Sequence, residues 1–304
     1  MSGDAVLAMP GLPALMRQAL AASGLTVRAS VETPEEIGAL VVSGGVVLDP
    51  TLVEKLPKLK LIAVHGVGYD GVDVAHARAR GVAVTNTPDV LTEDVADLAL
   101  GLVLSVLRQI PATERFLRDG EWAKGGRSPL TRRVTGLRYG VLGLGRIGRA
   151  IAARLAPFAG EVAYHSRRPV EGVDYRYAAD ALALAGSVDV LVVATPGGPE
   201  TRGLVNADVL EALGTDGLLI NIARGEVVDQ AALIAALQDG RLYGAGLDVF
   251  NGEPAVPQAL LDHPRCVLTP HVGSATVEAR TQMADLVVAN LRAGLAGEPL
   301  LTPV

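Results

Sequence analysis

The chain alternates short apolar runs with segments long enough to form helices, and this alternation restricts its fold more than any other feature. The pattern is typical of βαβ units, in which a helix connects two parallel strands. Hydrophobic residues make up 49% of the 304 residues, which is ample material for buried cores. We therefore predict an α/β fold with two doubly wound parallel sheets. The expected strands are Ala5–Ala8, Ala39–Val42, Leu61–Val64 and Val82–Val84 in a first domain, and Tyr139–Leu142, Glu161–Tyr164, Val188–Ala194, Leu218–Ile222, Tyr243–Val249 and Cys266–Thr269 in a second.

One expected helix is apolar on nearly every side. Thr92 can cap its first turn, and the acids Glu93 and Asp94 suit the positive end of the helix dipole. A helix that is apolar all round must be covered all round. We predict that Val95–Ile110 forms a spine between the two domains and packs against a second subunit in a homodimer. A polar loop, Gly120–Gly136, follows it.

Charge and cysteine content exclude several classes of protein. The net charge of −6 argues against a nucleic-acid partner, which needs a basic face. The single cysteine, Cys266, fits a reducing compartment because it cannot form an internal disulfide. No apolar run reaches the roughly 18 residues of a membrane-spanning helix, and no basic segment precedes an apolar one at the start. We expect a cytoplasmic protein without a membrane partner.

A glycine motif follows the first strand of the second domain. Gly143, Leu144, Gly145, Arg146, Ile147 and Gly148 spell G-x-G-x-x-G, directly after Tyr139–Leu142 and before a helical segment. In this context the glycines allow a tight turn, a close approach to a pyrophosphate, and close packing of the helix on the strand. The motif predicts a dinucleotide site at the helix N-terminus.

The next strand ends in residues that favour a phosphorylated ribose. A site for NAD usually has an acid about 20 residues after the motif, to hold the ribose 2′-hydroxyl. This chain has His165, Ser166, Arg167 and Arg168 there, without a carboxylate. Guanidinium groups suit a 2′-phosphate. We predict that NADPH is preferred and that NADH is possible.

Three further strands of the second domain are followed by an arginine, a glutamate and a histidine. Arg224, Glu253 and His271 are expected to meet because ligands of open α/β sheets lie at the carboxyl ends of the strands. Histidine is a natural proton donor near neutral pH, a carboxylate would favour its charged form, and arginine can bind a carboxylate. This set is chemically complete for the reduction of a 2-keto acid.

The same loops supply further expected contacts. Asp248 and Ser274 are candidates to bind the nicotinamide carboxamide. In the first domain, a glycine-containing turn follows the strand Leu61–Val64 and can form a nest of backbone N–H groups for the substrate carboxylate. We expect no metal, because the histidines and carboxylates lack metal-ligand spacing. The turn is made by His65, Gly66, Val67 and Gly68, and the remaining expected cofactor contacts are Thr195, Pro196, Ile222, Ala223 and His271.

Together these residues resemble the D-isomer-specific 2-hydroxyacid dehydrogenase family. The resemblance implies a flavodoxin-like substrate-binding domain of residues 1–93 and 276–304, with a Rossmann nucleotide-binding domain of residues 94–275 inserted into it. It also implies a homodimer, a small 2-keto acid substrate, and the roles of substrate binding for Arg224, support of the histidine for Glu253, and acid/base for His271. Within the family the chain most resembles the NADPH-dependent glyoxylate/hydroxypyruvate reductases. The matching stretches are His65–Asp73, Gly140–Gly148, Asn221–Asp229, Gly246–Pro254 and Thr269–Thr276.

Two other interpretations remain open. A non-enzymatic, nucleotide-sensing module similar to the corepressors of this fold would carry the same catalytic residues, although those proteins also have long flexible tails. Another NAD(P)-dependent dehydrogenase of related fold, such as a formate or alanine dehydrogenase, is the second alternative. Formate dehydrogenases pair the catalytic histidine with glutamine, so Glu253 favours a keto-acid reductase.

Overall fold

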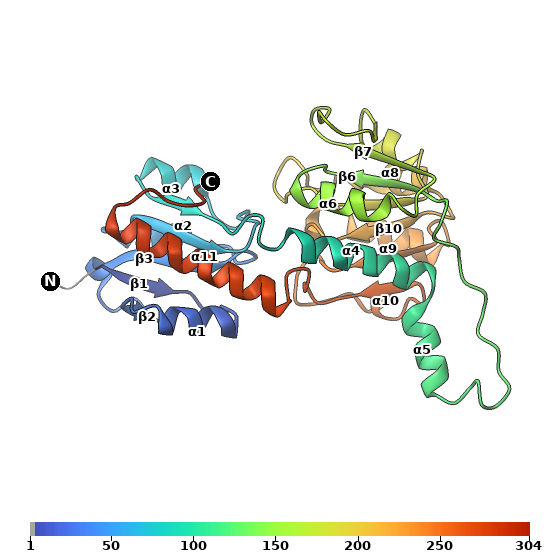
Figure 1. Cartoon of the computed structure of the whole chain (residues 1–304), viewed down its shortest axis with the longest axis horizontal. Helices are drawn as coiled ribbons and strands as arrows, with labels where there is room; N and C mark the ends of the chain where they lie inside the picture. Colours follow the sequence, from blue (N-terminus) through green and yellow to red (C-terminus); the bar gives the residue numbers. More distant parts are fainter. Residues whose placement is uncertain (1–3) are drawn as a thin grey trace. The chain divides into compact units, whose positions relative to one another are not determined.

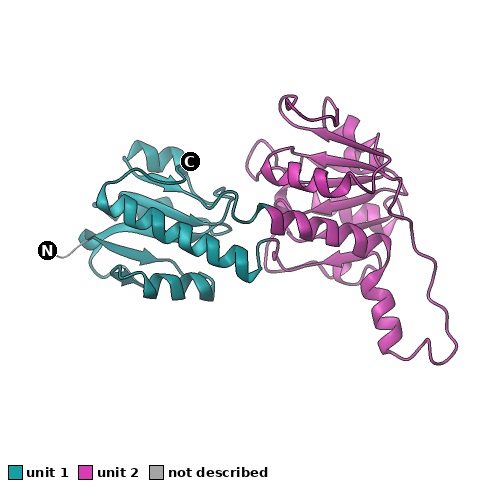
Figure 2. Ribbon diagram, in the orientation of Figure 1, with its two compact units in different colours: residues 1–92, 274–304 teal, residues 93–273 magenta. Residues whose placement is uncertain are grey.

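The computed structural model describes residues 4–304, and these form two compact units. Unit 1 comprises residues up to Thr92 together with Ser274–Val304, and unit 2 comprises Glu93–Gly273 (Figure 2). Both sheets are entirely parallel, as the predicted α/β fold class requires. The predicted domain boundaries, at 93/94 and 275/276, differ from these limits by one and two residues.

Unit 1 is a five-stranded sheet with the strand order β2-β1-β3-β4-β5, which is the flavodoxin-like order (Figure 1). Successive side chains of a strand point to opposite faces, so Val6 packs on one side with α1 and α11 while Leu7 packs on the other with α2. Thr276 caps α11 by accepting a hydrogen bond from the N–H group of Ala279 at 3.1 Å. The elements are β1 Ala5–Ala8, α1 Ala14–Ala22, β2 Val27–Arg28, η1 Pro34–Glu36, β3 Ile37–Ser43, α2 Pro50–Glu54, β4 Leu61–His65, α3 Val74–Ala79, β5 Ala83–Thr85 and α11 Val277–Ala296.

Unit 2 is a seven-stranded sheet with the order β12-β11-β10-β9-β6-β7-β8. The chain reverses direction across the sheet between β6 and β9, which is the switch point where ligands of such sheets bind. Its elements are β6 Arg138–Leu142, α6 Arg146–Leu155, β7 Glu161–His165, β8 Arg176–Tyr177, α7 Ala181–Ala185, β9 Val190–Val193, α8 Ala207–Leu213, β10 Leu218–Asn221, η2 Gly225–Val227, α9 Gln230–Gln238, β11 Gly244–Leu247, α10 Gln258–Leu261 and β12 Cys266–Leu268.

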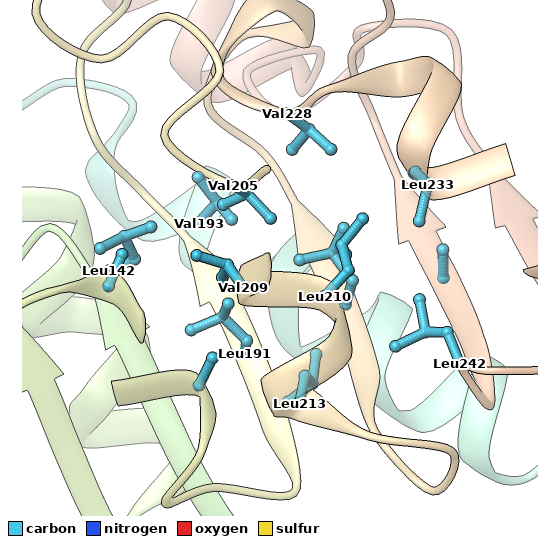
Figure 3. Packing of buried hydrophobic residues seen from close by; sticks show 14 of the residues in the cluster. Leu142, Leu191, Val193, Val205, Val209, Leu210, Leu213, Val228, Leu233 and Leu242 are labelled. Carbon is cyan, nitrogen blue, oxygen red and sulfur yellow. The ribbon is translucent and has the colours of Figure 1, made fainter. Parts of the chain in front are cut away.

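Helices cover both faces of this sheet. Leu191 and Val193 of β9 pack with Val209 and Leu210 of α8 in a continuous apolar cluster (Figure 3). On the other face, α4 (Thr92–Leu107) and α6 are tied together by Arg154, which pairs with Glu93 and Asp97 at 2.7 Å each. These ion pairs join α6, the helix after the glycine motif, to α4.

The predicted single helix Val95–Ile110 is wrong at its end. α4 stops at Leu107, Gln109 has φ of 50°, and a second helix, α5 (Ile110–Arg118), begins there. Pro111 is the physical reason, because it has no N–H group to offer the carbonyl of Leu107 and its ring would clash with that carbonyl. The N–H group of Arg132 satisfies the carbonyl of Leu107 instead, at 2.9 Å.

Within residues 4–304, no single helix is long and apolar enough to cross a membrane. Only α4 and α5 together reach that length and composition, and they are bent by 61° where they meet.

Candidate active site

The candidate site of unit 2 lies at the carboxyl ends of its strands. β6 leads into the glycine motif, β7 into Ser166–Arg168, and β10 into Arg224. β11 leads through Asp248 to Glu253, and β12 leads to His271. Because all these strands are parallel, their carboxyl ends share one edge of the sheet.

The glycine motif forms a cradle with an open centre. A Cβ atom at Gly148 would lie 1.9 Å from the carbonyl oxygen of Gly143, so only glycine lets α6 approach this closely. A Cβ atom at Gly145 would meet nothing within 4 Å. Gly145 is also the N-cap of α6, and it makes no side-chain cap, whereas Asp180 caps α7 with its carboxylate. The start of α6 therefore has no side-chain cap and has open space beside Gly145, which suits an anion such as a pyrophosphate.

The loop after β7 fixes its backbone and leaves its arginines extended. The hydroxyl of Ser166 donates to the carbonyl of Arg168 at 2.6 Å, and the hydroxyl of Tyr177 donates to the carbonyl of Ser166 at 3.2 Å. The side chain of Arg167 is 91% exposed, with only the carboxylate of Glu200 at 3.8 Å, and Arg168 is also exposed. Two guanidinium groups on a braced loop fit a 2′-phosphate.

His271 and Glu253 form a direct pair. Nδ1 of His271 lies 2.8 Å from Oε2 of Glu253, while Oε1 of Glu253 accepts the N–H of Phe250 at 2.8 Å. Burial acts to raise the pKa of Glu253, but the hydrogen bonds from His271 and Phe250 and the charges of His271 and Arg224 outweigh it, so this pKa is lowered. Glu253 therefore stays ionised and orients the ring, which leaves Nε2 as the nitrogen for a reacting oxygen.

Asp248 holds the loop that carries His271. Its carboxylate is 2% exposed and accepts hydrogen bonds from the hydroxyl of Thr269 at 2.6 Å and from the N–H groups of Val272 and Gly273 at 2.8 and 2.9 Å. His271 has φ of 53°, a left-handed conformation that is uncommon for residues other than glycine, and its N–H donates to the carbonyl of Asp248 at 2.8 Å. Burial raises the pKa of Asp248 against these hydrogen bonds. Its expected contact with the carboxamide remains a prediction.

Asn221 braces the loop of Arg224. It is 1% exposed, its Nδ2 donates to the carbonyl of Arg224 at 3.0 Å, and its Oδ1 accepts the N–H of Ala223 at 3.0 Å. The guanidinium of Arg224 donates to the carbonyl of Ala223 at 2.8 Å. Sequence reasoning treated Asn221 only as a strand residue, although a polar residue inside an apolar strand is a usable signal.

The other expected contacts fall into two groups. In unit 2, Ile222 and Ala223 are buried beside Arg224, Pro196 is exposed, and the hydroxyl of Thr195 is buried without a hydrogen-bond partner. In the motif, Leu144 is buried and Arg146 is exposed. His65, Gly66, Val67, Gly68 and Ser274 belong to unit 1.

The unit 1 turn is held by its neighbours and contains a buried histidine. The N–H of Thr87 bonds the carbonyl of Gly66 at 2.9 Å, and Asn86 donates to the carbonyl of Val67 at 2.8 Å. His65 is 3% exposed, and neither ring nitrogen has a hydrogen-bond partner. Burial first, and then the charge of Arg280, lowers the pKa of His65 to about 4.

Within the described residues 4–304, no three histidine, cysteine, aspartate or glutamate side chains gather as metal ligands would.

The fold and the site together define a dinucleotide-binding oxidoreductase. Its histidine–carboxylate pair and its arginine lie at the carboxyl ends of the strands, at the same edge of the sheet as the glycine motif. Residues 100–273 match the model of the D-isomer specific 2-hydroxyacid dehydrogenase, NAD binding domain. The chain is 50% identical over 270 residues to hydroxyphenylpyruvate reductase of Plectranthus scutellarioides, covering 89% of this chain and 86% of that one. It is 48% identical over 268 residues to a glyoxylate/hydroxypyruvate reductase of Arabidopsis thaliana, covering 88% and 85%.

Solved structures agree. The NADPH-dependent glyoxylate/hydroxypyruvate reductase of Sinorhizobium meliloti, in complex with NADP and malonate, superposes with a TM-score of 0.94 at 45% identity, covering 99% of this chain and 96% of that one. A 2-hydroxyacid dehydrogenase of Ketogulonicigenium vulgare gives 0.92 at 44% identity, covering 100% and 99%. The chain belongs to the D-isomer specific 2-hydroxyacid dehydrogenase family. The predicted family, fold class and NAD(P)-dependent oxidoreductase activity are confirmed.

Proposed function

We propose that the protein reduces a small 2-keto acid of the glyoxylate or hydroxypyruvate type with NADPH, giving the D-2-hydroxy acid. The observation that carries the proposal is the 2.8 Å contact between His271 and Glu253, at the same sheet edge as Arg224 and the glycine cradle. Relatives named for these substrates and a neighbour solved with NADP support it.

In this reaction NADPH, when bound, supplies a hydride to the keto carbon. His271 donates a proton from Nε2 to the keto oxygen as negative charge develops there, so the product is the neutral hydroxyl and the ring is left uncharged. Glu253 pairs with Nδ1 of His271 and so fixes the ring with Nε2 available for the transfer. The side chain of His271 is 42% exposed, so solvent can return the proton afterwards.

Arg224 binds the carboxylate of the substrate and polarises its keto group. A guanidinium offers parallel N–H donors that match a carboxylate, and this fixes the keto carbon in one orientation. Asn221 holds the backbone from which Arg224 projects, so the donor direction is set before the substrate arrives.

Different segments at the same edge of the unit 2 sheet bind different parts of the nucleotide. The N–H groups at the start of α6 bind the pyrophosphate, and Ser166, Arg167 and Arg168 bind the 2′-phosphate. Arginine side chains are always positively charged in proteins. The site therefore binds NADPH more tightly than NADH, because NADPH carries the additional negative charge of the 2′-phosphate. Further contacts come from Thr195, Pro196, Ile222, Ala223, Asp248 and Ser274.

Unit 2 is thus the nucleotide-binding domain and unit 1 the substrate-binding domain. In unit 1, His65 and the backbone N–H groups of Gly66, Val67 and Gly68 contact the substrate, with the nest of N–H groups receiving its carboxylate.

A homodimer and a cytoplasmic location complete the proposal. Large apolar side chains are exposed on α5 and the loop after it, at Ile110, Leu117, Trp122 and Leu130. Exposed apolar side chains on one segment favour burial of that segment against a second copy, together with α4. Sedimentation should give twice the monomer mass, and a monomer at micromolar concentration would contradict the dimer. The single cysteine suits a reducing compartment.

The experiment follows the absorbance of reduced nicotinamide with glyoxylate, hydroxypyruvate, phenylpyruvate and 2-ketogluconate, each with NADPH and with NADH. We expect rapid oxidation of NADPH with at least one acid. His271→Ala should lower kcat by roughly 10²–10⁴-fold, whereas His263→Ala, which changes a histidine of the same unit outside the site, should not. A folded protein that is silent with every acid and both nucleotides would point to a nucleotide sensor instead.

A further inference from the structure

The side chain of Arg224 contacts the loop that follows β9. A Cβ atom at Gly197 would lie 2.7 Å from Cγ of Arg224 and 3.4 Å from its Cβ. The missing side chain of Gly197 therefore leaves the space in which the stem of Arg224 lies. This loop forms a wall beside the side chain that we assign to the substrate carboxylate.

Glu226 holds that wall in place from two positions beyond Arg224. Its Oε1 accepts the N–H of Gly198 at 3.0 Å, and its Oε2 pairs with Arg202 at 2.9 Å. Its backbone carbonyl also accepts the N–H of Gly203 at 2.8 Å. One residue thus binds both ends of the segment from Gly198 to Gly203.

The backbone of Glu226 is itself fixed relative to Arg224. It lies inside η2, where the N–H of Val227 bonds the carbonyl of Arg224 at 3.2 Å. The carbonyl of Val227 in turn accepts the N–H of Val205 at 3.0 Å. Because Arg224 and Glu226 share this short turn, the position of the wall is set relative to the arginine.

We propose that Glu226 is a positioning residue for Arg224, which holds Gly197 and Gly198 against the arginine stem and so directs the guanidinium at the keto-acid carboxylate. The glutamate side chain is 32% exposed and lies outside the reacting pair of His271 and Glu253. Its loss therefore acts on substrate binding, not on proton transfer. The inference rests on the proposed function, because it concerns the same substrate.

The test compares Glu226→Ala, Glu226→Gln and Gly197→Ala with wild type. In Glu226→Ala both side-chain contacts are lost, and we expect the KM for the keto acid and the Ki for oxalate to rise about tenfold, the effect of one well-placed hydrogen bond. Glu226→Gln keeps an oxygen for Gly198 and should recover most of that loss. Gly197→Ala should raise the same two constants by crowding Cγ of Arg224 at 2.7 Å, while its Cβ would meet Oε1 of Glu226 only at an ordinary contact distance of 3.4 Å. Glu211→Gln removes an exposed charge of α8 and serves as the matched control.

The KM for NADPH, the shape of the pH–rate profile and the thermal midpoint should stay at wild-type values in Glu226→Gln. Keto-acid constants within twofold of wild type in Glu226→Ala would overturn the inference. Equal losses for NADPH and keto acid, or a Glu226→Gln as impaired as Glu226→Ala, would overturn it too, because they indicate general damage. If wild type reduces no keto acid at all, the proposed function fails first, and that outcome is visible before any variant is made.

Discussion

Replacing Glu253 by glutamine removes a negative charge beside His271 and nearly nothing else. The two side chains are 2.8 Å apart, and glutamine has the same shape with an oxygen or a nitrogen in place of Oε2. In the native protein the ionised carboxylate accepts a hydrogen bond from Nδ1 of His271 and so holds the ring with Nε2 available for the keto oxygen. The variant should therefore reduce the keto acid more slowly than wild type does.

The magnitude follows from the geometry. A hydrogen bond to a charged group contributes about 1.5–3 kcal/mol. The side chains of His271 and Glu253 are 42% and 33% exposed, so solvent screens part of this interaction. Screening moves the value toward the roughly 1 kcal/mol of surface pairs, and we expect about 1–2 kcal/mol. At about 1.4 kcal/mol for each factor of ten in rate, this corresponds to a roughly tenfold loss of kcat/KM.

The assay is kcat/KM for keto-acid reduction at about pH 7 and saturating NADPH. We expect a roughly tenfold lower value in Glu253→Gln than in wild type. Glu211→Gln, which changes an equal charge outside the site, should leave kcat/KM unchanged. A wild-type kcat/KM in Glu253→Gln would refute the reasoning, since the carboxylate would then have no effect on the ring that donates the proton.

Three further results are expected. Gly145→Ala should weaken NADPH binding and keep the thermal midpoint, because the added Cβ enters open space and meets no protein atom within 4 Å. Gly148→Ala should lower both the NADPH affinity and the thermal midpoint, because its Cβ would lie 1.9 Å from a backbone oxygen. Equal thermal midpoints for the two variants would contradict this. Replacing Arg167 and Arg168 by serine should raise the KM for NADPH much more than that for NADH, and equal changes would show that they do not read the 2′-phosphate. The pKa of His65 falls from 6.5 to about 4 on folding, so the unfolded chain binds more protons between these values and stability is lost as the pH falls through them. This loss amounts to about 3 kcal/mol, and a His65→Leu variant with the same pH dependence of urea unfolding would rule it out.

Much of the fold can be predicted from the sequence, because strands that are buried on both faces form short, continuous apolar runs. Leu61–Val64 and Tyr139–Leu142 match β4 and β6 to within one residue, and both strands are buried on both faces. The two-residue strands β2 and β8 are too short to show any periodicity, so no pattern predicted them. The break before α5 was missed because apolarity continues through Ile110, although Pro111 is a readable signal.

Some features of the candidate site could likewise be predicted from the sequence, and others could not. The sequence predicts that Glu253 and His271 follow neighbouring strands. In the folded sheet, Nδ1 of His271 lies 2.8 Å from Oε2 of Glu253. The direction of the Asp248 carboxylate was not predictable, because its partners lie 21 to 25 residues later and depend on how that loop folds back. The brace of Glu226 on Gly198 was missed for the same reason, since it joins two loops that are distant in sequence.

The central claim is that hydride and proton both reach a keto acid at this site, with His271 as the proton donor. The direct measurement uses NADPH carrying two deuterium atoms at C4 of the nicotinamide and hydroxypyruvate as acceptor, with mass and chiral analysis of the product. The account predicts one deuterium at C2 of D-glycerate for each NADPH consumed by wild type, and almost none from His271→Ala at equal protein concentration. Product without deuterium, product of the opposite hand, or equal turnover by His271→Ala would contradict it.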